Sequence, residues 1–370
     1  MALALVALLL SKAPLRLPRI WMPLAVFLTL TLVSLAASGD MASGLPQVRK
    51  MYVYSMLLVA FSLFRELRLI RWLIASWAGI GTLVAARGIV QFSAKLAEAR
   101  AAGKNFYEFY EPERITGFMS HWMTFGGQQM FVLLMLMAYL FWSPAARKRG
   151  MWFYLLCLGM LSTGLLLGYT RSIWIATGLA TLYLVWFWKR SMLLLAPVLL
   201  LIGFFMAPAS IRTRARSIFQ ARDNQVRLVM WETGLRMVEA HPWLGLGPEQ
   251  VKIQFKDYLA PDAPDPLPSG WYGHLHNFYL QYAAERGVPA MLVIVWMLLM
   301  MLTDFWKALR RLQPDEGDRR FILHGAIAVT LALMVAGLFE HNLGDTEVLT
   351  MFLVVAACGY VAAEKEPAVA

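Results

Sequence analysis

The chain is dominated by long apolar runs, and this feature constrains its fold more than any other. A membrane-spanning helix needs about 20 mostly apolar residues, and a backbone in lipid has to satisfy its hydrogen bonds internally. The runs therefore predict an all-α polytopic membrane protein with about 10–12 transmembrane helices. Ten of them span or nearly span a bilayer, at about 21–38, 51–64, 72–90, 121–142, 151–169, 172–188, 191–207, 288–306, 321–339 and 346–363.

The composition excludes a soluble protein. Of the 370 residues, 59% are hydrophobic and only 15% are charged, whereas soluble domains carry about 25% charged residues. The apolar segment Met1–Leu10 is interpreted as a short first span, because no charged region precedes it and no cleavage site follows. Cys157 and Cys358 lie inside apolar runs and indicate neither a disulfide framework nor a thiolate metal site.

The net charge of +11 is explained mainly by short clusters of Lys and Arg between the runs. In a soluble protein this excess would point to nucleic acid, but here it has the pattern of topology signals. If the spans alternate in direction, all the clusters fall on one side, which is then cytoplasmic. A further use for the excess is binding of anionic lipids or a phosphorylated substrate. The clusters are Lys12, Arg16 and Arg19; Arg65, Arg68 and Arg71; Arg147, Lys148 and Arg149; Lys189 and Arg190; Lys307, Arg310, Arg311, Arg319 and Arg320; and Lys365.

The opposite face receives the long loops and most of the unusual ionisable groups. It holds loop 91–118, the tight connection at 170–172, the long segment 208–275 and the group 340–342. We therefore expect one membrane domain in three parts. These are N-terminal transmembrane helices (1–207), a large non-cytoplasmic loop with amphipathic helices (208–275) and C-terminal transmembrane helices (276–370).

The large loop has internal order. Leu228, Trp231, Leu235 and Val238 recur at helical spacing and predict an amphipathic helix on the membrane surface. His241-Pro242 ends this helix, and four prolines between 261 and 268 predict an extended stretch after it. No internal repeat is visible, so the pattern gives no support to an inverted-repeat transporter.

The strongest local group is His274-Leu275-His276-Asn277, where a water-facing loop enters a span. Histidine titrates near neutral pH and can accept a proton from a hydroxyl, so it suits a general base. A helix cap completed by Asn277 is an equally good interpretation of the spacing. A zinc site is disfavoured, because no convincing further ligands lie nearby in the sequence.

Arginines form a second group of candidates. Arg171 lies between two apolar runs, where an arginine is costly unless it is paired, and this favours function over a snorkelling anchor. Arg227 opens the amphipathic helix, and its guanidinium can bind phosphate oxygens. The stretch before Arg227 is also basic, and we expect its first three arginines to contact lipid headgroups. It contains Arg212, Arg214, Arg216 and Arg222.

Four further residues are candidates for supporting roles. Arg114 ends the first long loop, and His121 starts the next span, where it caps the helix or contacts substrate. Glu340 and His341 end a span on the same face and can pair with each other or with an arginine. His241 and His324 are expected to be structural.

Several motifs occur together in a fixed order. They are Arg114-x-x-Gly117 with His121 and Met123-Thr124-Phe125; Thr170-Arg171-Ser172-Ile173-Trp174; Arg227 with Trp231, Gly234 and Met237; His241-Pro242-Trp243-Leu244-Gly245-Leu246-Gly247-Pro248; and His274-Leu275-His276-Asn277 with Tyr279-Leu280 and Glu285-x-Gly287.

This ordered set resembles the O-antigen ligase / O-antigen polymerase superfamily of bacterial membrane glycosyltransferases. The likeness covers about a third of the chain directly, mainly from Thr170 to Leu292. The family often has Ser before the first arginine and Gly after it, whereas Thr170 and Ser172 flank Arg171 here. The resemblance implies a helical membrane fold with a large periplasmic loop over a cavity. It also implies a glycan donor linked to undecaprenyl through a diphosphate, no cofactor, no metal, and inversion at the anomeric carbon.

These observations lead to a hypothesis for the mechanism. Arg171 and Arg227 clamp the diphosphate and stabilise the charge on the leaving group. His276 takes the proton of the acceptor hydroxyl, and His274 or Asn277 orients its ring. Glu285 belongs to the same motif and is expected to support the site. The acceptor is a lipid A–core oligosaccharide or a related hydroxyl, and the site faces the periplasm from the bacterial inner membrane.

Alternatives remain open at this level. A polymerase for O-antigen or exopolysaccharide shares the motifs and differs in its acceptor, and protein O-glycosylation is a further variant. A transporter or flippase would predict charged residues near mid-span and internal symmetry, and neither is evident. No feature indicates a nucleic-acid partner.

Overall fold

The computed structural model describes residues 14–148, 150–219, 225–268, 270 and 272–364. All regular elements among these residues are helices, so the predicted all-α membrane class is confirmed. Each of the ten predicted apolar runs is helical, and the runs 51–64 and 191–207 are each divided between a 3₁₀-helix and an α-helix. The predicted first span at Met1–Leu10 lies outside the described residues, as do Lys12, Arg149, Arg222 and Lys365. Within the described part of the chain, five helices are long and apolar enough to cross a bilayer: α5 (Leu67–Ala101), α7 (Trp122–Trp142), α15 (Phe278–Leu309), α16 (Gly317–Ala336) and α17 (Thr346–Ala363).

The described residues form two compact units. The described residues within 1–63, 220–303 and 334–354 form unit 1, and those within 64–219, 304–333 and 355–370 form unit 2. Helices α15, α16 and α17 each contribute to both. These units are defined by how closely their residues pack and not by their position in a membrane. The predicted division into membrane and loop parts therefore stays a prediction.

The remaining elements are shorter. Those of unit 1 are α2 (Trp21–Ala37), α3 (Met41–Arg49), η1 (Lys50–Tyr54), α4 (Ser55–Leu63), α13 (Gln225–Ala240), α14 (Gln250–Gln254), η5 (Phe255–Tyr258) and η6 (Asn342–Gly344). Those of unit 2 are α6 (Phe106–Tyr110), α8 (Pro144–Lys148), α9 (Met151–Leu167), α10 (Arg171–Trp188), η2 (Arg190–Leu195), α11 (Ala196–Met206), α12 (Ala209–Arg216) and η3 (Ser217–Phe219).

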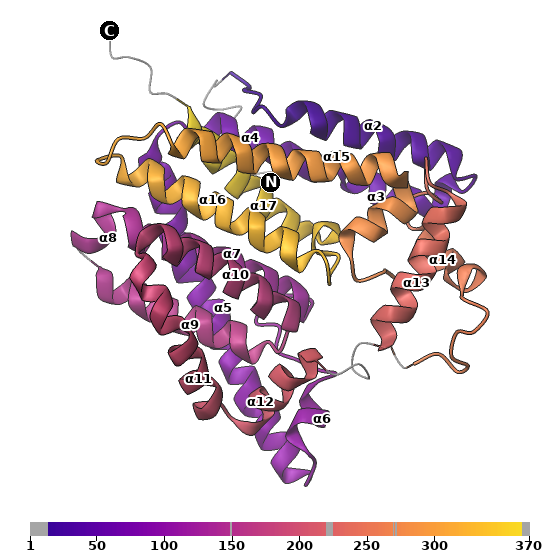
Figure 1. Ribbon diagram of the computed structural model, residues 1–370, viewed down its shortest axis with the longest axis horizontal. Helices are drawn as coiled ribbons and strands as arrows, with labels where there is room; N and C mark the ends of the chain where they lie inside the picture. Colours follow the sequence, from indigo (N-terminus) through magenta and orange to yellow (C-terminus); the bar gives the residue numbers. More distant parts are fainter. Residues whose placement is uncertain (1–13, 149, 220–224, 269, 271, 365–370) are drawn as a thin grey trace. The chain divides into compact units, whose positions relative to one another are not determined.

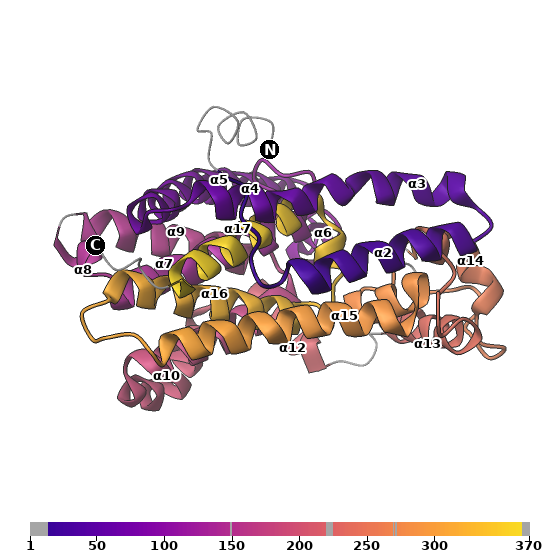
Figure 2. The same ribbon diagram turned by 90° about the horizontal axis from the view of Figure 1, so that it is seen from above.

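Unit 1 is organised around the N-terminal half of α15. Helix α2 runs beside it, as both ribbon views show (Figure 1, Figure 2). Ser34 Oγ on α2 donates to the carbonyl of Glu285 at 2.8 Å, and the rings of Phe27 and Tyr282 meet edge to face at 5.3 Å. These contacts hold the start of α15 in place.

Helix α13 confirms the predicted helix in the large loop, and it ends just before His241-Pro242 as expected. Leu228 and Leu235 of the predicted apolar face are 56% and 54% exposed, and their contact with a membrane surface stays a prediction. The buried face holds Val229, Met230, Thr233, Gly234 and Met237. A Cβ on Gly234 would lie 2.6 Å from a methyl carbon of Leu275, so only glycine permits this close approach.

Residues 241–248 form a turn that is bonded to a kink in α15. Gly287 breaks the helix with φ 84° and ψ 160°, which frees backbone groups for pairing. Val288 N–H donates to the carbonyl of Pro242 at 2.8 Å, and Gly247 N–H donates to that of Glu285 at 2.8 Å. A Cβ on Gly287 would lie 2.0 Å from the carbonyl oxygen of Trp243. The His241–Pro248 motif and the Glu285-x-Gly287 motif are therefore hydrogen-bonded to each other through their backbones.

Unit 2 contains a bundle of α5, α7, α9 and α10. Helix α9 packs against α5 and α7, and α7 also packs against α5 and α10. Helix α5 contributes a buried stripe of Ala78, Gly81, Ala85 and Gly88 at spacings of three and four residues. Small residues at this spacing let membrane helices approach closely. The predicted loop 91–118 is wrong at its start, because α5 continues to Ala101. The connection that follows is tied down by Tyr110, whose hydroxyl donates to the carbonyl of Leu167 at 2.6 Å.

Candidate functional site

The start of α15 presents the two imidazoles in a constrained backbone. Asn277 Oδ1 accepts the Leu280 N–H at 3.0 Å and so caps the helix. His276, directly before it, has φ 47°, a left-handed conformation that non-glycine residues rarely adopt. Leu275 between the imidazoles is fully buried, and its N–H donates to Gln281 Oε1 at 2.8 Å. The strained residue is held from both sides.

Glu340 connects His276 to Arg227. Its Oε2 lies 3.1 Å from His276 Nδ1, and its Oε1 accepts from Arg227 Nη2 at 3.0 Å. Burial alone would raise the pKa of Glu340, but the hydrogen bond and charge of His276 and the charges of Arg227 and His274 lower it to about 2. Glu340 is therefore ionised at neutral pH, and an ionised carboxylate only accepts hydrogen bonds.

The hydrogen bonds distinguish the two histidines. Because Glu340 accepts, His276 carries its proton on Nδ1, and the Nε2 lone pair remains to accept a proton. His274 Nδ1 instead accepts the backbone N–H of His276 at 3.2 Å. A neutral His274 then carries its proton on Nε2 and has no lone pair there. Of the two rings, His276 has the arrangement of a general base.

Glu285 anchors this region from beneath. It is buried, and its Oε1 accepts from Gln281 Nε2 at 2.8 Å and from the Glu249 N–H at 3.0 Å. Its Oε2 lies 3.2 Å from Nη1 of Arg286, which is also buried. Gln281 also binds the backbone before His276, so Glu285 supports the histidine loop through a chain of hydrogen bonds.

His341 is a third imidazole in the same region. Its ring centroid lies 6.0 Å from that of His274 and 5.4 Å from that of Tyr282. Burial and the nearby positive charges, His274 and Arg286 foremost, hold its pKa well below the ordinary value. His341 is therefore neutral at neutral pH.

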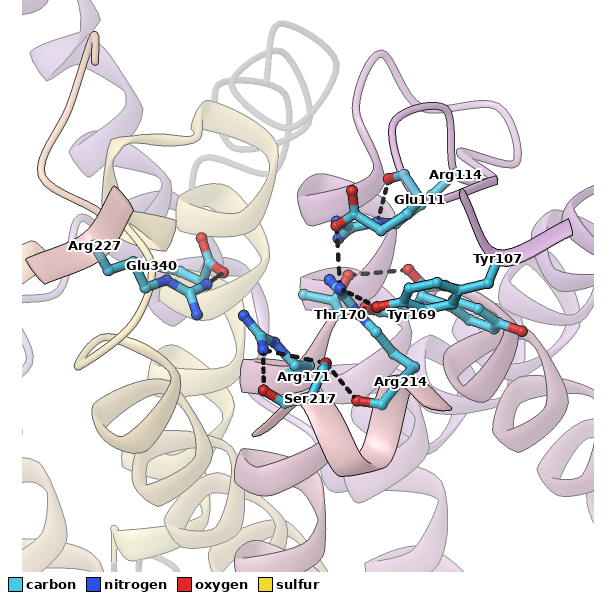
Figure 3. A network of polar contacts seen from close by, with 11 residues as sticks. Tyr107, Glu111, Arg114, Tyr169, Thr170, Arg171, Arg214, Ser217, Arg227 and Glu340 are labelled. Atoms are coloured by element: carbon cyan, nitrogen blue, oxygen red, sulfur yellow. Dashed lines mark hydrogen bonds and ion pairs between the residues drawn. The ribbon is translucent and has the colours of Figure 1, made fainter. Parts of the chain in front are cut away.

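In unit 2, Arg171 lies at the first position of α10 and is buried (Figure 3). Its Nη1 donates to the carbonyl and the hydroxyl of Ser217, at 2.6 and 3.2 Å. The residue two positions earlier, Tyr169, has φ 51°, so the tight α9–α10 connection is strained. These bonds fix the direction of the guanidinium.

Arg214 holds this strained connection, and sequence reasoning missed it. Only 6% of Arg214 is exposed, so the prediction that it contacts lipid headgroups is wrong. Its Nε donates to the carbonyl of Tyr169 at 2.8 Å, and its carbonyl accepts from the Ser217 hydroxyl at 2.8 Å (Figure 3). The alternation of arginine with Ile, Thr and Ala in α12 gives no sign that one arginine alone points inward.

Arg114 and His121 have local partners. Arg114 Nε donates to the carbonyl of Glu111 at 2.9 Å, and its Nη2 is paired with the Glu111 carboxylate. Glu111 also accepts from Arg214 at 3.1 Å. Burial raises the pKa of Glu111, but the charges of Arg114 and Arg214 lower it below its ordinary value. His121 Nδ1 accepts the Met123 N–H at 3.2 Å, so His121 caps α7, as one sequence interpretation predicted.

Two other histidines have the structural environments predicted for them. His241 Nε2 lies 2.9 Å from the Tyr258 hydroxyl on an exposed surface, and His324 stacks on Trp142 at 4.0 Å. Within the part of the chain that the structure describes, no group of three or more His, Cys, Asp or Glu side chains could hold a metal ion.

Comparison with known proteins agrees with the motifs. No curated protein matches the chain. A family model described as O-Antigen ligase matches residues 156–295, a stretch that contains Arg171, Arg227 and the His274–Glu285 motif. Residues 156–295 are therefore similar to the O-antigen ligase family, which confirms the resemblance predicted from the sequence motifs.

Proposed function

We propose that the protein transfers a glycan from undecaprenyl diphosphate to a hydroxyl of a lipid A–core or related acceptor, on the periplasmic side of the bacterial inner membrane. The family match supports a ligase- or polymerase-type enzyme. The distribution of Lys and Arg clusters supports the orientation, because the histidine loop falls on the face opposite to them.

The observation that carries the proposal is the His276–Glu340 pair. In the proposed step, His276 Nε2 takes the proton of the acceptor hydroxyl as its oxygen attacks C1 of the donor sugar. The bond from C1 to the diphosphate oxygen breaks, and undecaprenyl diphosphate leaves with that electron pair. Glu340 keeps His276 in the reactive tautomer and stabilises the imidazolium that forms, as the buried carboxylate does in a serine protease triad. Attack from the face opposite the leaving group inverts the anomeric carbon.

The arginines are assigned to the leaving group. Arg227 shares Glu340 with His276 and has further N–H groups that can bind a phosphate oxygen. Arg171 is held by Ser217 with its direction fixed, which favours electrostatic stabilisation without reorganisation. That both arginines act on one diphosphate stays a prediction. His274, Asn277, Glu285, Arg114 and His121 are assigned to support the site, since each has a structural partner in its own unit.

No residue of the proposed step requires a metal ion or a cofactor. A diphosphate is already a good leaving group, so a second carboxylate acting as a glycosidase acid is not needed. The proposed transfer step therefore requires one general base and positive charge near the diphosphate.

The test is transfer in vitro by the purified full chain from a polyprenyl-diphosphate glycan, with lipid A–core and free glycan offered in parallel. We expect His276→Ala to lower kcat by at least about 100-fold, and Arg171→Ala and Arg227→Ala to lower kcat as well. His241→Ala is the matched control, because it removes an exposed imidazole that contacts Tyr258. Normal transfer by folded His276→Ala protein would eliminate the proposed base. Extension of free glycan instead of lipid A–core would make the enzyme a polymerase.

A further inference from the structure

Unit 1 contains a pocket that the proposed mechanism does not use. It lies among α2, η1, the start of α15 and the loop after α16, and its walls include the rings of Phe27, Tyr54 and Tyr282. The side chains that bring charge or hydrogen-bonding nitrogens to it include Lys50, Arg286 and His341. The pocket combines aromatic walls with polar groups, which is the composition of a small-ligand site.

Two buried nitrogen atoms of the lining residues have no hydrogen-bond partner among the described residues. They are Nε of Arg286 and Nδ1 of His341. Arg286 is only 5% exposed, and its guanidinium lies over the ring of Tyr282 at 4.7 Å. A guanidinium nitrogen can only donate, so its missing partner has to be an acceptor. Buried donors without partners are rare and call for an explanation.

The charge of the lining is positive. Lys50 and Arg286 line the pocket, and no carboxylate does. Glu285 binds Arg286 but also accepts two other hydrogen bonds, so it does not satisfy the whole guanidinium. The acidic side chain of Glu347 lies close enough to Lys50 to interact with it electrostatically, Asp345 interacts with Glu347, and neither carboxylate is part of the lining. An acceptor with negative charge fits these groups best.

The pocket adjoins the proposed base. His341 lines it, and the ring of His341 lies 6.0 Å from that of His274, which in turn lies 4.1 Å from that of His276. A group bound against His341 is thus separated from His276 only by the imidazole of His274. A sugar that offers its hydroxyl to His276 has neighbouring substituents within this distance.

We propose that this pocket binds an anionic substituent, a phosphate or carboxylate, of the acceptor glycan and so aligns the acceptor hydroxyl with His276. The inference rests on the proposed glycan transfer and adds to it the chemical class of the acceptor. Arg286 and His341 supply the buried donors, and Lys50, which is exposed, supplies a charge at the pocket. The aromatic rings contact the sugar that carries the anion.

The experiment uses the purified full chain, a polyprenyl-diphosphate glycan donor and lipid A–core as the acceptor. Lys50→Ala is the main variant, because this exposed side chain is not needed to fill the core. We expect it to raise the KM for the acceptor about tenfold, the cost of one charge-assisted hydrogen bond, with kcat and the donor KM unchanged. Lys50→Arg should restore the KM. Arg49→Ala is the matched control, since Arg49 is an exposed cation next in sequence that does not line the pocket.

Two modified acceptors identify the anion, one treated with phosphatase and one with its carboxylates amidated. We expect one of them to abolish the difference between Lys50→Ala and the parent protein. A difference that persists with both, an unchanged acceptor KM, or a raised donor KM would overturn the proposal. The assays are run in neutral and in anionic lipid nanodiscs, and an effect confined to the anionic discs would assign the pocket to a lipid headgroup instead.

A binding measurement separates this inference from the proposed function. Labelled acceptor is titrated into His276→Ala protein with and without Lys50→Ala, so that no transfer is required. Weaker binding on loss of Lys50 supports the pocket even if the parent protein transfers no glycan. Equal binding by both proteins overturns the pocket even if transfer is observed.

Discussion

The substitution Glu340→Gln tests the pairing on which the proposed chemistry depends. It keeps the size of the side chain and removes its charge. The pKa of Glu340 is lowered to about 2 from an ordinary 4.5, and each unit corresponds to about 1.4 kcal/mol, so the surroundings favour the ionised form by about 3 kcal/mol. A glutamine loses this interaction and leaves Arg227 and His276 with a weaker partner.

The catalytic effect is expected to exceed the effect on stability. An amide can donate its N–H to Nδ1 of His276, which moves the proton of the ring to Nε2 and blocks the base. The equivalent change in a serine protease triad lowers kcat about 10⁴-fold. We therefore expect Glu340→Gln to lower kcat by about 10³–10⁴-fold, with the unfolding free energy reduced by up to about 3 kcal/mol.

Both quantities are measurable on purified protein in detergent. Transfer kinetics give kcat, and a thiol-reactive fluorophore reports unfolding through Cys157 and Cys358, which are both buried. Glu232→Gln is the control, since Glu232 is an exposed glutamate with a single distant partner, Arg236, at 3.9 Å. Glu340→Gln protein that keeps kcat within about threefold of the parent, while folded, would refute the assigned tautomer and the carboxylate's role.

Three further outcomes follow from the same contacts. Acidification should destabilise unit 1, because the pKa of Glu340 is lower in the folded protein than in the unfolded chain. The stability that Glu340 contributes above about pH 5 is lost as the pH falls toward about 2. The unfolding midpoint measured against pH should show this loss, and the loss should be smaller in Glu340→Gln. Gly287→Ala should cost several kcal/mol or prevent expression of folded protein, since its Cβ would lie 2.0 Å from the Trp243 carbonyl oxygen; parent-like thermal unfolding would contradict this. Arg214→Ala should lower the free energy of unfolding by about 2–4 kcal/mol and should also lower kcat. Arg216→Ala removes an exposed neighbour and should change the free energy of unfolding by no more than about 0.5 kcal/mol. Equal effects of the two substitutions would contradict the special role of Arg214.

Much of the candidate site is predictable from the sequence alone. His276, Arg171 and Arg227 stand out because ionisable groups are costly beside apolar runs, and the motif order pointed to the family. The pairing of Glu340 with His276 was out of reach, because 64 residues separate them and nothing local relates the two. Asn277 was open to two interpretations, and the helix start resolves it as a cap.

The error at Arg214 has a clear physical cause. Arg214 was assigned to the lipid surface by its neighbours' charge, but it is buried because the strained Tyr169 carbonyl needs a donor. A long-range contact there outweighs the local average of charge.

Sequence alone determined the class of the protein, its helices and the chemical character of its loops, because hydrophobic length and charge placement are local properties that a bilayer reads directly. Tertiary structure decided which groups act together. Glu340 reaches His276 and Arg227, Arg214 reaches Tyr169, and the turn at 241–248 is bonded to the kink at Gly287, each through a contact between segments far apart in the chain. Hydrogen bonds and backbone strain depend on ångström-scale geometry, which only the folded chain specifies.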